Sequence, residues 1–309
     1  MSQLTMLQVI LGVGESVVAP ASYKWIRFNF AEKERGLAVG LYMAGTKIGP
    51  AIGPPLTAWL IVHYDWRVMF LILGLGGLIW LVPWVALVPN DAQRPAKDGS
   101  KGTAPSPIKF ARLMASPVVW GTVIATFCYM YFVYFCMTWM PAYFVEQRHQ
   151  SLAKMGLYTF FSFAGMAAMA ALGGWAADGM IRRGGNPVTV RKWFTIAGFL
   201  IACTELIGAR SSSLTMAVTF AVVSLSGLGL ATANYWAITQ TLFPAASIGR
   251  MAGVQNCAAS VAGIVAPIVT GWLKQQTGSY EAPMKAIWIV LIVGILSYLT
   301  MVREKYIPD

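Results

Sequence analysis

The feature that most constrains the fold is an apolar segment, interrupted by glycine and proline, that occurs twice in the sequence. The first copy runs from Arg35 to Leu60, and the second ends with Ile264 to Leu273, at a constant offset of 213 residues. The aligned pairs include Gly40 and Gly253, Pro54 and Pro267, Thr57 and Thr270, and Trp59 and Trp272. Long internal repeats of this kind are typical of transporters that are built from two related bundles.

Composition places the chain in lipid. Hydrophobic residues make up 57% of the 309 residues and charged residues only 11%. Uncharged apolar runs of about 20 residues are long enough to cross a bilayer as helices. We therefore predict an all-α, polytopic membrane protein with nine spans, at residues 3–23, 36–62, 68–88, 118–145, 155–177, 193–209, 214–243, 251–273 and 286–302.

The basic residues that give the net charge of +11 are distributed by loop. Alternate loops and the C-terminal tail on one side of the predicted membrane hold 16 of the 23 Lys and Arg residues, and the other side holds 6. This asymmetry indicates topology, with the rich side and the C-terminus in the cytoplasm, and argues against a nucleic-acid surface. We expect a multi-pass protein of a plasma membrane, the bacterial inner membrane.

One long polar stretch divides the spans. Residues 89–117 are rich in Pro, Gly, Ser and Lys and are predicted to be a flexible cytoplasmic linker. Three spans precede it (residues 1–88) and six follow it (residues 118–309). Because the repeat pairs the second span with the eighth, the first three spans correspond to the last three of a six-helix bundle, and the N-terminal bundle is incomplete.

Several short motifs resemble those of the major facilitator superfamily, and of its anion:cation symporter branch in particular. This branch includes hexuronate, galactonate and sialic-acid carriers. The motifs are LGVGES (Leu11 to Ser16), ERG (Glu34 to Gly36), IGPAIGPPL (Ile48 to Leu56), DWRVMF (Asp65 to Phe70), TWMPAYF (Thr138 to Phe144), GVQN (Gly253 to Asn256) and GIVAPIVTG (Gly263 to Gly271). The resemblance covers the whole chain and implies the major facilitator fold of twelve helices, of which this sequence holds nine and lacks the first three.

Glu15 is the candidate proton-coupling residue. It lies about twelve residues into the first span, or ~18 Å along a helix, which is close to the midplane of the membrane. Ionisable groups at this depth are costly and are functional by default. In the resemblance, Glu15 corresponds to the glutamate of the helix-four motif that couples transport to protons; the alternative is a glutamate paired only for packing.

Lys47 lies at a similar depth in the second span, at ~17 Å, and is a candidate ligand for a substrate carboxylate. The family usually places an arginine seven residues before the helix-four glutamate, where this sequence has Gln8. We infer, as a hypothesis, that Lys47 supplies the missing cation. The alternative is an ion pair between Glu15 and Lys47 that only neutralises both.

Further candidate substrate ligands lie on the spans that resemble family helices seven, ten and eleven. Amides, phenols and an indole can orient hydroxyl and carboxylate groups, although each of them can equally form an interhelical hydrogen bond. The candidates are Tyr131, Tyr134, Asn234, Tyr235, Trp236, Thr239 and Asn256.

A second set of residues resembles the second-half copy of the superfamily's cytoplasmic gating motif. It comprises Gly174, Asp178, Arg182 and Arg183. We expect these charges to form a latch between helices that closes in one state and separates in another; a plain role in membrane topology is the alternative. Glu205, in the next span and five residues before Arg210, is expected to extend its carboxylate to the interface or to pair locally.

Together these features predict a secondary active transporter that moves a small organic anion, a sugar acid or an aromatic carboxylate, by proton-coupled symport and alternating access. An efflux antiporter of the same superfamily and a truncated fragment that does not transport are the alternatives. The sequence has no zinc-ligand spacing and no nucleophile triad, so we expect no enzyme activity, metal or cofactor. The expected partners are the anion, the proton and the bilayer, with a monomer by default.

Overall fold

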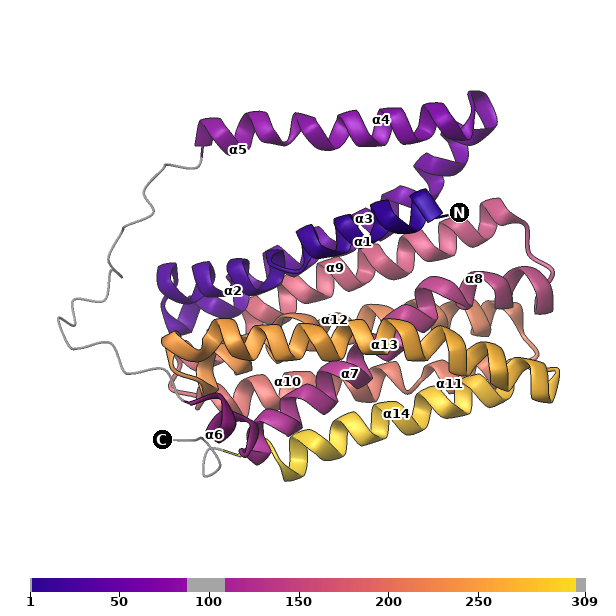
Figure 1. Cartoon of the computed structure of the whole chain (residues 1–309). Helices are drawn as coiled ribbons and strands as arrows, with labels where there is room; N and C mark the ends of the chain where they lie inside the picture. The colour runs from indigo at the N-terminus through magenta and orange to yellow at the C-terminus, as the bar shows by residue number, and fades with distance from the viewer. Residues whose placement is uncertain (1, 88–108, 304–309) are drawn as a thin grey trace.

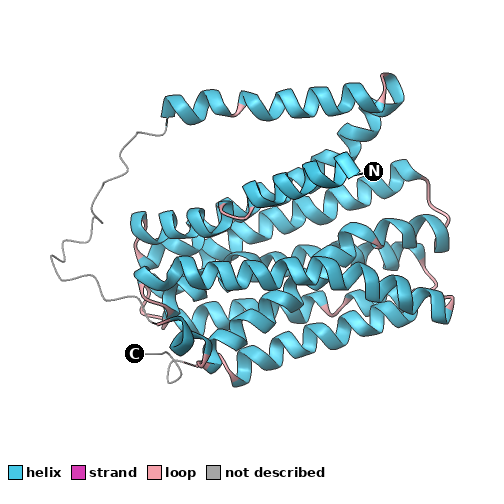
Figure 2. Ribbon diagram, viewed as in Figure 1, coloured by secondary structure: helices cyan, strands magenta, loops and turns pink. Residues whose placement is uncertain are grey.

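The computed structural model describes residues 2–87 and 109–303, and its regular secondary structure in these ranges is helical (Figure 1, Figure 2). Before residue 88 the elements are α1 (Ser2–Glu15), α2 (Val18–Asn29), the 3-10 helix η1 (Glu32–Glu34), α3 (Arg35–His63), α4 (Trp66–Ile79) and α5 (Leu81–Leu87). After residue 108 they are α6 (Phe110–Met114), α7 (Pro117–Thr138), α8 (Met140–Ala142), the π-helix η2 (Tyr143–Gln147), α9 (Leu152–Arg182), α10 (Pro187–Ala202), α11 (Glu205–Arg210), α12 (Leu214–Leu242), the 3-10 helix η3 (Ala245–Ser247), α13 (Ile248–Thr277) and α14 (Glu281–Thr300).

Each predicted span falls mainly on helical residues, wherever the structure describes it. Seven helical segments among the described residues are long and apolar enough to cross a membrane; they begin at Trp66 and end at Thr300. The first two predicted spans are not among these seven, so the count of nine spans stays a prediction. α3 is long enough to span with 29 residues, and it contains Lys47 together with several glycines and prolines.

The first predicted span is broken where a continuous helix was expected. α1 ends at Glu15, and α2 begins at Val18 after a short turn. The hydroxyl of Ser16 donates to the carbonyl of Val13 at 2.7 Å, which is the local side-chain bond by which serine competes with helical geometry.

The six helical segments of the second half form one bundle that also carries part of the first half. α12 packs against α9 and α10, and α7 packs against α13 and α14. From the first half, α3 lies along α9 and also contacts α12, while α2 packs against α13. α4 and α5 extend away from this body (Figure 1) and are almost entirely exposed. Of the predicted linker 89–117, residues 89–108 lie outside the described residues, but its last part is α6 and is packed, with Leu113 fully buried.

The sequence repeat is also a structural repeat. A 3-10 turn at Glu32–Glu34 leads into α3, and a 3-10 turn at Ala245–Ser247 leads into α13, at the same offset of 213 residues. The two helices have 29 and 30 residues. The paired residues Trp59 and Trp272 are 51% and 58% exposed near the same end of each helix, as expected of aromatic residues at a membrane interface.

Candidate functional site

A buried lysine lies between the two halves of the chain. Lys47 of α3 is only 6% exposed, and its Nζ atom is 5.8 Å from the centre of the Tyr129 ring of α7. Among the described residues no carboxylate forms an ion pair with it. The alternative of a neutralising pair between Glu15 and Lys47 is therefore wrong for this structure, and the ammonium group contacts an aromatic face instead.

Aromatic side chains from both halves meet beside this lysine. Tyr23 of α2 stacks on Trp236 of α12, with ring centres 4.1 Å apart and an interplanar angle of 21°. Tyr42 of α3 meets Tyr23 edge to face at 5.5 Å, and on the other side Tyr235 lies 5.3 Å from Trp236 and 4.5 Å from Tyr129. The result is a continuous aromatic wall that spans the interface between the halves.

A buried amide adds an unused acceptor to the same region. Gln255 of α13 is fully buried, and its Nε2 donates to Thr126 Oγ1 of α7 at 3.0 Å. Its Oε1 atom has no hydrogen-bond partner in the described structure. Thr126 lies one helical turn before Tyr129, so the free carbonyl oxygen and the lysine approach the same face of α7. A buried polar atom left without a partner is a place where a ligand hydroxyl or a water can bind.

The other predicted substrate ligands differ in burial and in their hydrogen-bond partners. Trp236 and Tyr235 are in the aromatic wall, and Tyr131 is buried in α7, whereas Tyr134 and Asn256 are half-buried. Asn234 is fully buried and donates to the carbonyls of Gly173 in α9 and Leu230 in its own helix, at 3.3 and 2.9 Å. Thr239 donates to the carbonyl of Tyr235, at 3.2 Å. The bond from Asn234 to Gly173 is of the interhelical kind that the sequence left open as the alternative, whereas the bond of Thr239 stays within α12.

Glu15 is not in this cluster. It is the last residue of α1, it is exposed, and α1 packs mainly against α2. The side chain of Gln8 lies outside the described part of the chain. A coupling role for Glu15 therefore stays a prediction from sequence.

A buried carboxylate closes the end of the structure where α3 begins. Asp178 of α9 is fully buried and accepts the backbone N–H groups of Gly36 and Leu37, the first turn of α3, at 3.0 and 2.7 Å. A carboxylate in this place satisfies the free N–H groups of a helix N-terminus and complements its dipole. The predicted gating residue is therefore bound to the other half of the chain.

Arg191 and Glu32 complete this contact, and the sequence analysis missed both. Arg191 of α10 is fully buried, with Nη2 at 3.1 Å from Asp178 Oδ1, 3.4 Å from Glu32 Oε1 and 2.8 Å from the Glu32 carbonyl oxygen. Arg182 donates to the carbonyl of Lys33 at 3.3 Å, whereas the other predicted arginine, Arg183, is exposed. We call Asp178, Arg191, Glu32 and the first turn of α3 the inter-bundle latch. The sequence signal for Arg191 was an arginine just before the predicted start of a span.

Glycines make the close approach at the latch possible. A Cβ atom on Gly174 of α9 would overlap the carbonyl of Gly36, and a Cβ on Gly36 would overlap Asp178 and Arg191. One turn further along, a Cβ on Gly40 would lie 2.6 Å from the carbonyl oxygen of Ala170. Small residues at such crossings allow two membrane helices to pack backbone to backbone.

Comparison with known proteins now identifies the architecture. The profile described as Major Facilitator Superfamily matches residues 1–267. The chain belongs to the Major Facilitator Superfamily. Its members are transporters, in agreement with the prediction that the chain is not an enzyme.

Relatives of this superfamily member are sugar-acid transporters. It is 28% identical to the hexuronate transporter of Bacillus subtilis, over 97% of this chain and 73% of the relative. It is also 28% identical to the D-galactonate transporter of Escherichia coli, over 96% of this chain and 74% of the relative. Among solved structures, the E. coli fucose:proton symporter has a TM-score of 0.63 at 15% identity and is covered to 74%, which shows a shared fold.

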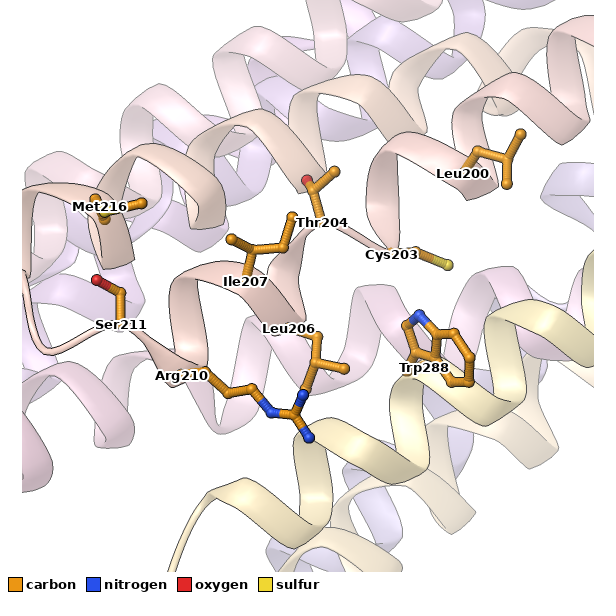
Figure 3. A pocket seen from close by; sticks show the side chains of 9 residues that line it. All are labelled: Leu200, Cys203, Thr204, Leu206, Ile207, Arg210, Ser211, Met216 and Trp288. Atoms are coloured by element: carbon orange, nitrogen blue, oxygen red, sulfur yellow. The ribbon is translucent and has the colours of Figure 1, made fainter.

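A groove of about 660 Å³ lies elsewhere on this Major Facilitator chain (Figure 3). It opens between α10, α11, the start of α12 and α14. The residues that line it are Leu200, Cys203, Thr204, Leu206, Ile207, Arg210, Ser211, Met216 and Trp288. None of these belongs to the lysine cluster or to the latch, so the groove is not a candidate for the transport site.

Proposed function

We propose that this member of the superfamily carries a small organic anion, of the sugar-acid class, across a membrane. The supporting observation is Lys47, a buried cation that no described carboxylate neutralises, beside an aromatic wall built from both halves of the chain. The substrate carboxylate would bind the Lys47 ammonium, a sugar ring would pack on Tyr129 and Trp236, and hydroxyl groups would reach the free oxygen of Gln255. The names of the relatives support the sugar-acid class.

The latch supports alternating access as the mechanism. In this structure the latch holds α3 against α9 and α10 at one end of the interface, so a substrate between the halves would be closed off from that side. Breaking the latch while the other end closes would expose the same lysine to the opposite side. We assign the latch to the cytoplasmic face, in a bacterial inner membrane, because the basic loops lie at this end.

Proton coupling through Glu15 is the finer part of the proposal. A proton on Glu15 would compensate the charge that a bound anion brings into the membrane. Symport predicts that an imposed inward proton gradient drives accumulation of galactonate in proteoliposomes that contain the chain, and that Glu15→Gln abolishes this accumulation while counterflow of galactonate persists. In an efflux antiporter, the same inward proton gradient would instead drive galactonate out of the proteoliposomes.

Substrate class is tested by comparing an acid with its neutral counterpart. The quenching of tryptophan fluorescence by galactonate and by galactose would give two dissociation constants for the chain in detergent. A charged hydrogen bond contributes about 1.5–3 kcal/mol, so the preference for galactonate should fall roughly 10- to 150-fold in Lys47→Gln and be largely kept in Lys47→Arg. Lys285→Gln removes an exposed lysine and is the control. An unchanged preference in Lys47→Gln would exclude Lys47 as the carboxylate ligand.

A further inference from the structure

A second carboxyl group is buried in the bundle of the second half. Glu205 is the first residue of α11 and is 5% exposed. The expectation that it reaches the interface is wrong, because its side chain is buried, and the nearby Arg210 pairs instead with Glu281 at 3.8 Å. The helix break at Cys203 and Thr204, between α10 and α11, instead directs Glu205 toward α12.

The partner of Glu205 is a hydroxyl group. Ser224 Oγ of α12 lies 2.5 Å from Glu205 Oε2 and 3.0 Å from the carbonyl oxygen of Ala221. The titratable groups of other elements that lie near enough to be affected by the carboxyl group are the buried thiol of Cys136 on α7 and the buried phenol of Tyr143 on η2. Neither carries a positive charge, and no described Lys, Arg or His forms an ion pair with Glu205.

The charged residues on the neighbouring elements are occupied elsewhere. Arg148, after η2, donates to the hydroxyl of Tyr143 at 2.7 Å and to the carbonyl of Ser211, at the end of α11, at 2.5 Å. On α14, Glu281 and Lys285 are exposed and pair with each other at 2.9 Å. Arg148 therefore links the end of α11 to Tyr143 and forms no ion pair with Glu205.

The hydrogen bonds around Ser224 favour the neutral form of Glu205. Ser224 has one hydroxyl hydrogen but two oxygen neighbours. A protonated Glu205 donates to Ser224 Oγ, and Ser224 then donates to the carbonyl of Ala221, so both short contacts are hydrogen bonds. An ionised Glu205 would leave one contact unmade and would place an uncompensated charge inside a membrane bundle.

We propose that Glu205 and Ser224 form a proton-binding site of the second half, distinct from Glu15, in which the carboxyl group holds its proton at neutral pH. Exchange of this proton requires α11 to move away from α12. The groove in Figure 3 runs along α11 and also reaches α10, α14 and the start of α12, and it leaves space for that movement. The proposal does not depend on sugar-acid transport or on any role of Glu15.

Infrared difference spectroscopy of the chain in lipid nanodiscs and D₂O tests the site directly. The spectrum of the unmodified chain minus that of Glu205→Gln should contain the C=O stretch of a protonated carboxylic acid at neutral pH. Glu281→Gln, which removes an exposed, ion-paired carboxylate, is the matched control and should show carboxylate bands only. Carboxylate bands for Glu205 as well would overturn the proposal.

A second variant keeps the test independent of how Glu205→Gln folds. Ser224→Ala should keep the acid band and shift it to higher frequency, because the donated hydrogen bond is lost. In the unmodified chain, the band should persist across the neutral pH range. A band that does not move in Ser224→Ala, or one that converts to carboxylate at the pH where an exposed glutamate titrates, would refute the proposed pair.

Discussion

Removal of the latch carboxylate should open the end of the structure where α3 begins. In Asp178→Ala the first turn of α3 loses the acceptor of two backbone N–H groups, and Arg191 loses its closer ion-pair partner at 3.1 Å, with both residues fully buried. Breaking a buried ion pair by removing one partner costs about 3–5 kcal/mol. The cost applies to the closed state, because in an open state these groups are hydrated.

This difference acts on the equilibrium between closed and open states. Because about 1.4 kcal/mol is a factor of ten, the ratio of closed to open molecules should fall about 150- to 5,000-fold. Spin labels attached after Lys33→Cys and Arg183→Cys, with the four native cysteines replaced, report this opening as a longer interspin distance by double electron–electron resonance. Both label positions are exposed, with Lys33 in η1 and Arg183 directly after α9.

A carboxylate outside the latch provides the control for Asp178→Ala. Asp65→Ala removes an exposed carboxylate that caps α4, outside the latch, and should leave the distance unchanged. Arg191→Ala should open the latch as Asp178→Ala does, and the double variant should be less perturbed than the sum of the two, because no buried charge is then left alone. An unchanged distance distribution in Asp178→Ala, or fully additive effects in the cycle, would contradict the role that we give to the latch.

Three further predictions concern packing, the aromatic wall and pH. In Gly40→Ala the new methyl group meets the carbonyl of Ala170, and because such overpacking typically costs about 1–3 kcal/mol, the thermal unfolding midpoint should fall. Gly45→Ala faces open space on the same helix and should raise stability by about 0.5–1 kcal/mol. Equal effects of the two variants would refute the close α3–α9 crossing. Tyr23→Ala removes the ring stacked on Trp236, so it should shift the tryptophan emission to longer wavelength. The same shift should appear when Tyr23→Ala is made in a Trp25→Ala background, because Trp25 is an exposed tryptophan on the same helix and is not the residue that reports the change. Hydrogen bonds from Lys274 and Tyr280 hold the pKa of Glu146, which lies after the predicted span, below its usual range. Because the folded pKa is depressed, the contribution of Glu146 to stability is present above the unfolded pKa of about 4.3 and is lost as the pH falls through the folded value. The thermal unfolding midpoint of the unmodified chain should therefore exceed that of Glu146→Gln at neutral pH, and the two midpoints should converge in acid. A difference between the midpoints that persists in acid would exclude this linkage.

Local sequence patterns predicted much of the fold. Long apolar runs became helices, and the repeat at an offset of 213 residues placed the same turn-and-helix unit at Arg35 and at Ile248. Breaks inside the runs were missed, at Ser16 in the first span and at Cys203 in the sixth. Hydropathy averages over about 20 residues, so it does not register a turn that is made by one or two local hydrogen bonds.

The candidate site was predicted less completely than the fold. Lys47, Tyr235 and Trp236 meet at the interface between the halves, but the equally central Tyr23, Tyr129 and Gln255 were not singled out. Aromatic residues in an apolar run look alike in sequence, whether they face lipid or a partner helix. Which face is covered depends on helices that are distant in the chain.

The sequence by itself determined that this chain is a helical membrane protein with a repeated turn-and-helix unit, because helix formation and lipid solubility depend on residues that are close together in the chain. Only the tertiary structure decided which charges meet. Asp178 binds the N-terminus of α3, 142 residues away, and Lys47 faces Tyr129 with no contact to Glu15. A buried charge takes the partner that helix packing brings within about 4 Å, and that packing is a property of the whole bundle.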